Sequence, residues 1–441
     1  MESYLTGFET FSQNGASSAP QWARSLRLSA ITRFEELGFP TTKNEDWHFT
    51  SVAPIVERDF TPLTGHPPAR VTAEQLAPFA FGGNDWHTLV FVNGHFHASL
   101  SNVAAVPDGV RVLPLGQAYD ELPLLVERHV GRIASYDAHT FTALNTAFIH
   151  DGAFIELQAN AVVDQPIHLV FVSEGQGEAV AHPRNLIVAA QNSRASIIES
   201  YVCVRDNTYF TNSVTEISLG EGARLDHYKI QRESEQSFHV GTIQARQSRA
   251  SQLHSFSFAV GGALARTNIY TSLAGDGATC TLNGLYLTDG AQHIDNQTRI
   301  EHIAPNCPSH EVYKGILDGR SHGVFNGKVY VHPEAQKTDG KQSNNNLLLS
   351  PHARIDTKPE LEIFADDVKC THGATVGRLD EVAMFYLNSR GIGPDTARML
   401  LTYAFAADVL ETIELEALKK ALEGMVLSRF ADSGAGTRPA R

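Results

Sequence analysis

One turn pattern recurs at nearly constant spacing in the middle of the chain. The segments NSRASII, EGARLDHY, QSRASQLHS and GDGATCTLNG each place a small residue just before a short apolar run, and Ala195, Ala223, Ala250 and Ala278 follow one another at separations of 28, 27 and 28. A unit of that length holds two or three short strands and cannot cover its own apolar face, so it must stack on its neighbours. The spacing therefore predicts a β-solenoid.

The repeat belongs to a longer stretch with strand character. From about Ala161 to Cys370, short apolar runs alternate with Gly, Asn, Pro and Ser, and no segment has a convincing helical period. The turn pattern returns at Ala335 and Ala353, where a shorter separation of 18 shows that the regularity fades. A β-sandwich stays an alternative, because strands at intervals of about 8–12 residues also fit that fold.

The sequence divides into three parts and a tail. Near the N-terminus, an amphipathic helix is predicted from Trp22 to Leu37, and the strand HTLVFV is predicted before the turn at Asn93-Gly94. We therefore expect a mixed N-terminal domain over residues 1–150, a β-solenoid core over 151–376, a helical C-terminal domain over 377–430 and a disordered tail over 431–441.

Three helical patterns follow Gly377. The first ends at Arg390-Gly391, and Pro394 suits the first position of the next helix. The third carries apolar residues from Leu415 to Phe430. Two interpretations stay open: the helices cap the open strand edges of a solenoid, or they dock a partner protein through exposed apolar residues.

Charge and composition exclude several classes of protein. The chain has 35 Lys and Arg against 49 Asp and Glu, a net charge of −14, which argues against a nucleic-acid binder. No run of about 18 apolar residues occurs and the first residues lack a basic and apolar leader, so we expect a soluble, cytoplasmic protein without membrane contact. No CxxC pair joins the four cysteines, which argues against a zinc ribbon and a dense disulfide framework; they are Cys203, Cys280, Cys307 and Cys370.

The densest set of reactive side chains lies in KPELEIFADDVKCTHGAT, residues 358–375. In an extended strand Cys370 and His372 point to the same face, so a thiolate and an imidazole can reach one soft or borderline metal. Two ligands do not complete a site, and the rest must come from elsewhere in this chain or from a second chain. The alternative is that Cys370 is a small buried hydrophobe and His372 a surface residue.

Other catalytic patterns are missing from the sequence. Asp366 and Asp367 face opposite sides of a strand and cannot flank one sugar bond. Five histidines fall between His293 and His332, but they form no HxxxH or HExxH pattern. There is no GxSxG elbow, no Walker-type loop and no GxGxxG between a strand and a helix, so any nucleotide chemistry must come from a partner.

Several long segments resemble the SufB/SufD family of iron–sulfur cluster assembly proteins. The longest is LLLSPHARIDTKPELEIFADDVKCTHGATVGRLDEVAMFYLNSRGI, and HEVYKGILDGRSHGVFNGKVYVHPEAQKTDGKQSNNN, FTALNTAFIHDGAFIEL and GFPTTKNEDWHFT extend the likeness over most of the chain. The KPELEIFADDVKCTHGAT form and the modest length are similar to the SufD branch of the family. The resemblance implies a right-handed parallel β-helix between a mixed N-terminal domain and a helical C-terminal domain.

The resemblance also implies partners and a site. The chain would pair with SufB through its β-helix edge, and a transient iron–sulfur cluster would form near Cys370 and His372 at that interface, with no cofactor held tightly by the isolated chain. The chain would be a scaffold and not an enzyme, because ATP hydrolysis would belong to SufC. The C-terminal helices would dock the ATPase SufC through Phe385, Tyr386, Leu400, Leu401 and Phe405.

Three further possibilities stay open from the sequence. The isolated chain has an open edge through which it could form a homodimer. It could be a purely structural partner that stabilises SufB. A polysaccharide-active β-helix enzyme would need carboxylates repeated at the rung spacing, and the sequence has no such cluster.

Overall fold

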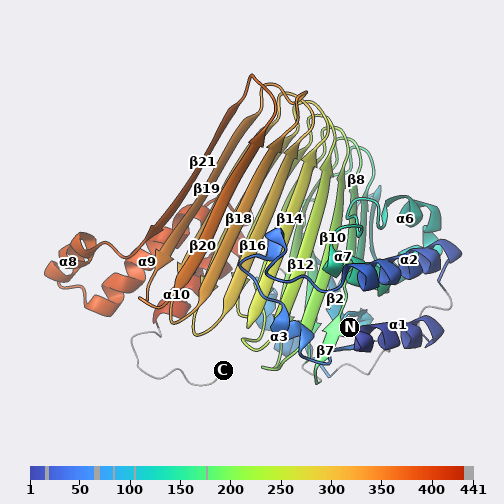
Figure 1. The fold of residues 1–441 in the computed structure, drawn as a ribbon, viewed down its shortest axis with the longest axis horizontal. Coiled ribbons are helices and arrows are strands. Elements are labelled where there is room, and N and C mark those ends of the chain that lie inside the picture. The colour runs from blue at the N-terminus through green and yellow to red at the C-terminus, as the bar shows by residue number, and fades with distance from the viewer. Residues whose placement is uncertain (15–18, 64–69, 83–84, 104–105, 175–176, 432–441) are drawn as a thin grey trace.

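The structure is a computed structural model that describes residues 1–14, 19–63, 70–82, 85–103, 106–174 and 177–431. Its main body is a stack of long strands in two sheets, with helices gathered on either side (Figure 1). None of the helices in these ranges is long and apolar enough to cross a membrane. The predicted disordered tail falls, from residue 432 on, outside the described residues.

The helices lie near the two ends of the chain. The predicted N-terminal helix is confirmed as α2, which ends at Gly38, where a φ of 65° favours glycine. The three predicted C-terminal helices are also confirmed, and Pro394 is the first residue of α9. The sequence did not predict the helix at the very start. The α-helices are α1 (Glu2–Asn14), α2 (Gln21–Leu37), α3 (Ala53–Val56), α4 (Ala73–Leu76), α5 (Leu115–Glu121), α6 (Pro123–His129), α7 (Thr140–Ala147), α8 (Glu381–Ser389), α9 (Pro394–Leu410) and α10 (Glu416–Ala431).

Strands fill the region between these helices. The predicted strand HTLVFV is β2, and the Asn93-Gly94 turn that follows has φ angles of 52° and 87°. The strands are β1 (Thr61–Pro62), β2 (His87–Val92), β3 (His95–Phe96), β4 (Val110–Pro114), β5 (Ala153–Leu157), β6 (Ile167–Ser173), β7 (Ala179–Ala181), β8 (Arg184–Ala189), β9 (Arg194–Cys203), β10 (Phe210–Leu219), β11 (Arg224–Arg232), β12 (Phe238–Gln247), β13 (Gln252–Val260), β14 (Leu264–Leu273), β15 (Thr279–Thr288), β16 (His293–His302), β17 (Pro308–Leu317), β18 (His322–Val331), β19 (Asp339–Leu348), β20 (Arg354–Ile363) and β21 (Lys369–Gly377).

Successive strands alternate between two sheets, which confirms the β-solenoid and rejects the β-sandwich. One sheet has the order β20-β18-β16-β14-β12-β10-β8-β5-β4, and the other β21-β19-β17-β15-β13-β11-β9-β6-β2-β3. Among the described strand pairs only β2–β3 and β4–β5 are antiparallel. The chain crosses from one sheet to the facing sheet and back again. Every second strand therefore lies beside the previous strand of its own sheet, one turn of the solenoid, or rung, further along.

The repeat is present, and its predicted alignment is right at Ala223 and Ala278 but wrong by two positions at Ala195 and by one at Ala250. The first residues of β9, β11, β13 and β15 are Arg194, Arg224, Gln252 and Thr279, and they stand in register. Ala195 lies inside β9 and Ala250 in the turn before the equivalent position. A fixed period misaligns them because the turns differ in length. The equivalent buried small residues are Ser193, Ala223, Ser251, Ala278, Cys307 and Thr338.

These turns share one backbone conformation. The residue before each buried small residue has a positive φ between 54° and 69°, at Asn192, Gly222, Ala250, Gly277, Asn306 and Lys337. Its N–H donates to a carbonyl of the next rung, as in the 2.9 Å bond from Gly222 to Arg249. Gly and Asn accept this conformation easily, whereas other residues lose roughly 1–2 kcal/mol in it. The turns are therefore stacked by hydrogen bonds as well as by packing.

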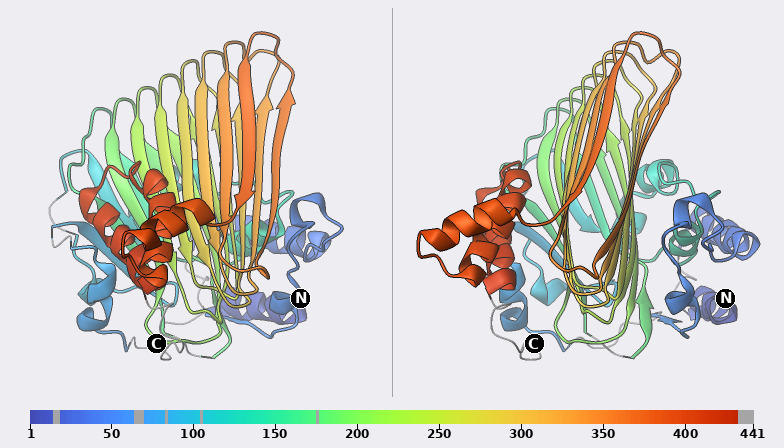
Figure 2. Two further views of the ribbon diagram at one scale, coloured as in Figure 1. Left: turned by 90° about the vertical axis from the view of Figure 1, so that its left-hand side faces the viewer. Right: turned by 60° about the vertical axis from the view of Figure 1, so that its left-hand side comes forward.

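The two groups of helices lie on opposite faces of the strand stack (Figure 2). On one face α7 packs against β10, and on the other α9 packs against β15 and β17. Buried residues of the C-terminal helices, among them Val409 and Leu422, share an apolar cluster with Tyr228 and Phe256 of the sheet. The helices therefore cover the sheet faces and leave the last strands, β20 and β21, without a further rung on their outer side.

Candidate functional site

Cys370 and His372 lie on β21, the last strand of its sheet. The strand pairs with β19 alone, and the register places Cys370 beside Gly340 and His372 beside Gln342. Gly340 and Gln342 are both buried between the sheets, so their neighbours on β21 face the same interior at its open end. The structure thus brings the two predicted residues to one face of an edge strand.

The two side chains differ in exposure. Cys370 is half-buried and packs against an apolar cluster that contains Val329 and Val331, whereas His372 is exposed. Burial raises the pKa of the Cys370 thiol, so a metal ion or a partner charge is needed to convert it to the thiolate that binds metals.

The pair is not a complete metal site within this chain. Among the described residues no group of three or more His, Cys, Asp or Glu side chains is placed to hold a metal ion. The carboxylates near the pair are engaged elsewhere: Asp367 pairs with Lys337, and Asp339 lies 3.3 Å from Lys341. A cluster at this strand would take its remaining ligands from another chain.

The open end also exposes apolar residues. Ile363 and Phe364 lie at the end of β20 and just after it, and Val376 lies near the end of β21; the exposed fractions are 37%, 57% and 51%. Edge strands of this length offer unpaired backbone groups to a second strand. The open end therefore combines free backbone, apolar side chains and the reactive pair.

The predicted docking residues of the C-terminal helices divide into two groups. Phe385 and Tyr386 on α8 are 74% and 57% exposed, and α8 stands away from the sheets (Figure 2). Leu400 is 38% exposed and Leu401 is partly buried. Phe405 packs against the apolar cluster beneath α9, with the Lys314 ammonium 4.8 Å from its ring. Its contacts within the chain identify Phe405 as part of the joint between helix and sheet.

The N-terminal motif has a structural contact that the sequence did not indicate. Trp47 lies under the Arg266 guanidinium at 3.7 Å from its ring centre. Thr50 is buried, donates to Asp295 at 2.6 Å and lies 2.8 Å from His293 Nε2. Segments far apart in the sequence are thus joined, and the motif is fixed against β14 and β16.

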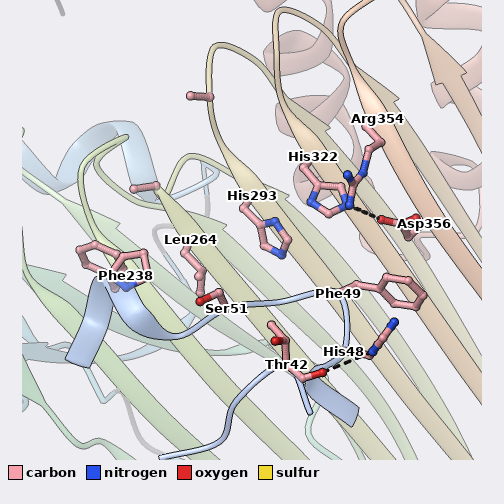
Figure 3. Close-up of a pocket in the computed structure, with 13 residues that line it drawn as sticks. Thr42, His48, Phe49, Ser51, Phe238, Leu264, His293, His322, Arg354 and Asp356 are labelled. Carbon is pink, nitrogen blue, oxygen red and sulfur yellow. Dashed lines mark hydrogen bonds and ion pairs between the residues drawn. The ribbon is translucent and has the colours of Figure 1, made fainter. Parts of the chain in front are cut away.

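This motif forms one wall of a cavity of about 770 Å³. Figure 3 shows its floor, a row of side chains in register on successive strands: Phe238, Leu264, His293, His322 and Arg354. The Asp356 carboxylate lies 2.7 Å from His322 and 2.9 Å from Arg354, so the two basic groups and the acid satisfy one another. Cys370 and His372 do not line this cavity.

Polar residues also lie between the sheets, where the sequence predicted none. Near the middle of the solenoid Glu199 lies 3.2 Å from His227, and Glu233 lies 2.7 Å from His239, and all four are buried. Nearer the open end Glu311 accepts a 2.7 Å hydrogen bond from the Gln342 amide. Glu311 and Gln342 occupy the same position in their strands as His372 does in β21. Alignment of the strands in the sequence could therefore have identified them.

Two family models match most of the chain. Residues 171–405 match the model of the SufBD core domain of SUF-system iron–sulfur cluster assembly, and residues 1–169 match the SufBD N-terminal region. The chain belongs to the SufBD family. Members of this family take part in iron–sulfur cluster assembly, and that role therefore extends to this chain.

Individual relatives place the chain near the SufD branch of the SufBD family. It is 33% identical over 413 residues to the iron–sulfur cluster assembly protein SufD of Escherichia coli, covering 93% of this chain and 92% of that protein. A SufBD family protein of Synechocystis is 33% identical over 414 residues, which cover 91% and 90% of the two chains. SufD of Bacillus subtilis is 29% identical over 436 residues, covering 96% and 97%.

Proposed function

We propose that this chain is a SufD-like scaffold subunit that pairs with SufB, docks SufC and helps to form a nascent iron–sulfur cluster at the SufB interface. The observation that carries the proposal is the position of Cys370 and His372 on an edge strand, where two potential ligands face an incomplete site. A second chain that extends the sheets would supply the missing ligands and cover the exposed apolar residues.

Edge-to-edge pairing explains several features of the open end together. β20 and β21 end their sheets at the same place, so one partner β-helix can continue both. The partner would bury Phe364 and Val376, which are exposed in the isolated chain. A second copy of this chain fits the same edges about a two-fold axis, so a homodimer is the alternative assembly of the isolated chain.

The C-terminal helices are suited to a second partner. α8 has no buried residue, and its exposed Val382, Phe385 and Tyr386 form an apolar surface that nothing in the described chain covers. The segment from Gly377 to Asp380 links β21 directly to this helix. We infer that SufC binds α8 and that its ATP-dependent movement shifts β21, which exposes Cys370 and His372 to iron and sulfide.

Co-purification with SufB and SufC tests the assembly. Val376→Lys places a charge on the β21 edge and should abolish SufB binding while leaving SufC binding intact. Phe385→Glu should have the reverse effect. Leu124→Lys on α6, an exposed apolar residue at 77%, is the matched control and should retain both partners. Retention of SufB by Val376→Lys would contradict pairing through this edge.

Anaerobic cluster reconstitution then tests the two ligands. The complex that carries Cys370→Ala together with His372→Ala should lose the cluster absorbance that the wild-type complex shows. If both complexes hold the cluster equally, the chain is a structural and mechanical arm that stabilises SufB. If ATP leaves the reactivity of the Cys370 thiol unchanged in the complex, the proposed movement of β21 is wrong.

A further inference from the structure

The inward-facing side chains of the solenoid form columns, because equivalent strand positions stack from rung to rung. The column that ends at His372 contains Leu282 on β15, Glu311 on β17 and Gln342 on β19, each in register with the next. Leu282 is fully buried and closes the inner side of this column. Leu282 therefore separates the polar residues near the open end from Ser255 and His227, which lie further inside the same column.

Burial of the Glu311 carboxyl at this position is energetically unfavourable. The residue is 1% exposed, and the side chains that hydrogen-bond its carboxyl, Thr298 and Gln342, are both neutral. The titratable groups whose pKa values its charge raises are Cys280 and Tyr313, neither of which is a cation. A buried carboxyl without a cation costs several kcal/mol relative to an apolar residue, and the rung before it carries Leu282 instead. A cost of this kind points to a function.

Gln342 connects Glu311 to the last rung. It is 3% exposed, and its Nε2 donates to Glu311 Oε2 at 2.7 Å. This bond fixes the direction of the amide, since only the NH₂ side can donate to the carboxylate. The other amide atom, Oε1, is buried and has no partner among the described residues. The strand on its outer side is β21, and the residue in register there is His372.

We propose that, when a partner chain covers the open end, Gln342, oriented by Glu311, accepts a hydrogen bond from the His372 ring and so leaves the other ring nitrogen free to bind a metal ion. Metal-binding histidines commonly donate their second ring N–H to a carbonyl or carboxylate, which fixes the tautomer and the ring orientation. Glu311 and Gln342 are positioning residues in this arrangement. The inference rests on the proposed function of His372 as a ligand.

The ring tautomer tests the positioning directly. In the complex with SufB, with this chain alone labelled with ¹⁵N-histidine, the His372 signals are assigned by their loss in His372→Asn. The wild-type ring should show one protonated and one unprotonated nitrogen in a fixed tautomer. In Gln342→Met, which removes the amide, the signals should move to those of a freely exposed imidazole. Unchanged signals in Gln342→Met overturn the inference.

Two further variants separate positioning from folding. Glu311→Gln keeps an oxygen that accepts from Gln342 and should retain the wild-type His372 signals, whereas Glu311→Leu should lose them. Asn344→Leu removes a buried amide from the neighbouring column, where Asn344 donates to the Tyr313 carbonyl at 3.2 Å, and is the matched control. If Asn344→Leu alters the His372 signals as much as Gln342→Met does, the effect is structural and the inference is wrong.

Co²⁺ binding to the complex with SufB distinguishes this inference from the proposed function. His372→Ala should weaken Co²⁺ binding, and an unchanged affinity contradicts the ligand role itself. Gln342→Met should weaken it by roughly 10–100-fold, the usual effect of losing an outer hydrogen-bond partner. A weakened His372→Ala with an unchanged Gln342→Met contradicts only the positioning role.

Discussion

The interior of the solenoid has two polar regions that differ in the partners of their buried carboxylates. Between β9 and β12, Glu199 accepts hydrogen bonds from Thr215 and Tyr201 and lies beside His227. Near the open end, Glu311 is buried with the neutral amide of Gln342. The first region satisfies its charges within the chain, whereas the second leaves polar atoms unmatched next to Cys370 and His372.

The pKa values reflect this contrast. Burial by itself raises the pKa of Glu199, but His227 and the neighbouring hydroxyl groups lower it below its ordinary value. Burial raises the pKa of Glu311 to about 7, and its hydrogen bonds do not offset that rise. Groups with strained geometry or strongly shifted pKa values are more frequent at functional sites than among residues that only support the fold. By this criterion Glu199 supports the fold and Glu311 supports the site.

The largest expected contrast is in thiol reactivity. Cys280 is buried in the interior and Cys370 is half-buried at the open end, in the same column three rungs apart. Cys280 reacts only when the chain opens, which costs at least about 4 kcal/mol and slows modification by roughly a thousandfold. Iodoacetamide labelling read by mass spectrometry checks this order. Equal rates for the two thiols would remove the distinction between interior and open end.

Breaking a buried ion pair away from the open end should cost the most stability. Arg184 and Glu216 are both fully buried, with Nε and Oε1 3.0 Å apart, beneath the N-terminal helices. Arg184→Met leaves Glu216 without its cation and should lower the free energy of unfolding by about 3–5 kcal/mol. Urea unfolding measures the loss. The control Lys420→Met breaks an exposed pair with Glu416 and should change the midpoint little.

Glu311 should make stability depend on pH in one direction. Its pKa rises from 4.5 to about 7 on folding, so the folded chain holds more protons than the unfolded chain between these values. The free energy of unfolding therefore falls as the pH rises through this window, by on the order of 3 kcal/mol. Thermal unfolding of wild type and Glu311→Gln from pH 5 to pH 8 measures the difference. Parallel profiles for the two proteins would show that Glu311 does not titrate in the fold.

The smallest effect is expected at the surface contact between the N-terminal motif and β20. Lys358 lies 3.0 Å from Glu45, and the side chains are 36% and 78% exposed. Glu45→Gln should leave the urea midpoint unchanged within error, because solvent screens exposed pairs. It should also leave SufB binding unchanged. A loss of SufB binding in this variant would extend the proposed interface to the N-terminal motif.

Local patterns in the sequence predicted much of the architecture. The helix that ends at Gly38 and the helix that begins at Pro394 are specified by a terminal glycine and a first-turn proline, which act on a few neighbouring residues. The solenoid follows from short apolar runs that recur with turns of one conformation. The strand that carries Cys370 and His372 was also predictable, since both lie two positions apart in one extended segment.

The tertiary structure decided what the sequence left open, and register is the physical reason. Strand side chains alternate between faces, so a shift by one residue moves a side chain from the interior to the surface. Rungs of unequal length cannot be aligned by a fixed period, and so Glu311, Gln342 and His372 become one column only when the pairing is known. Likewise the contact of Trp47 with Arg266 joins distant segments whose local sequences carry no sign of each other. The sequence alone determined the kind of fold and the reactive strand, and the pairing of strands determined which side chains act on it.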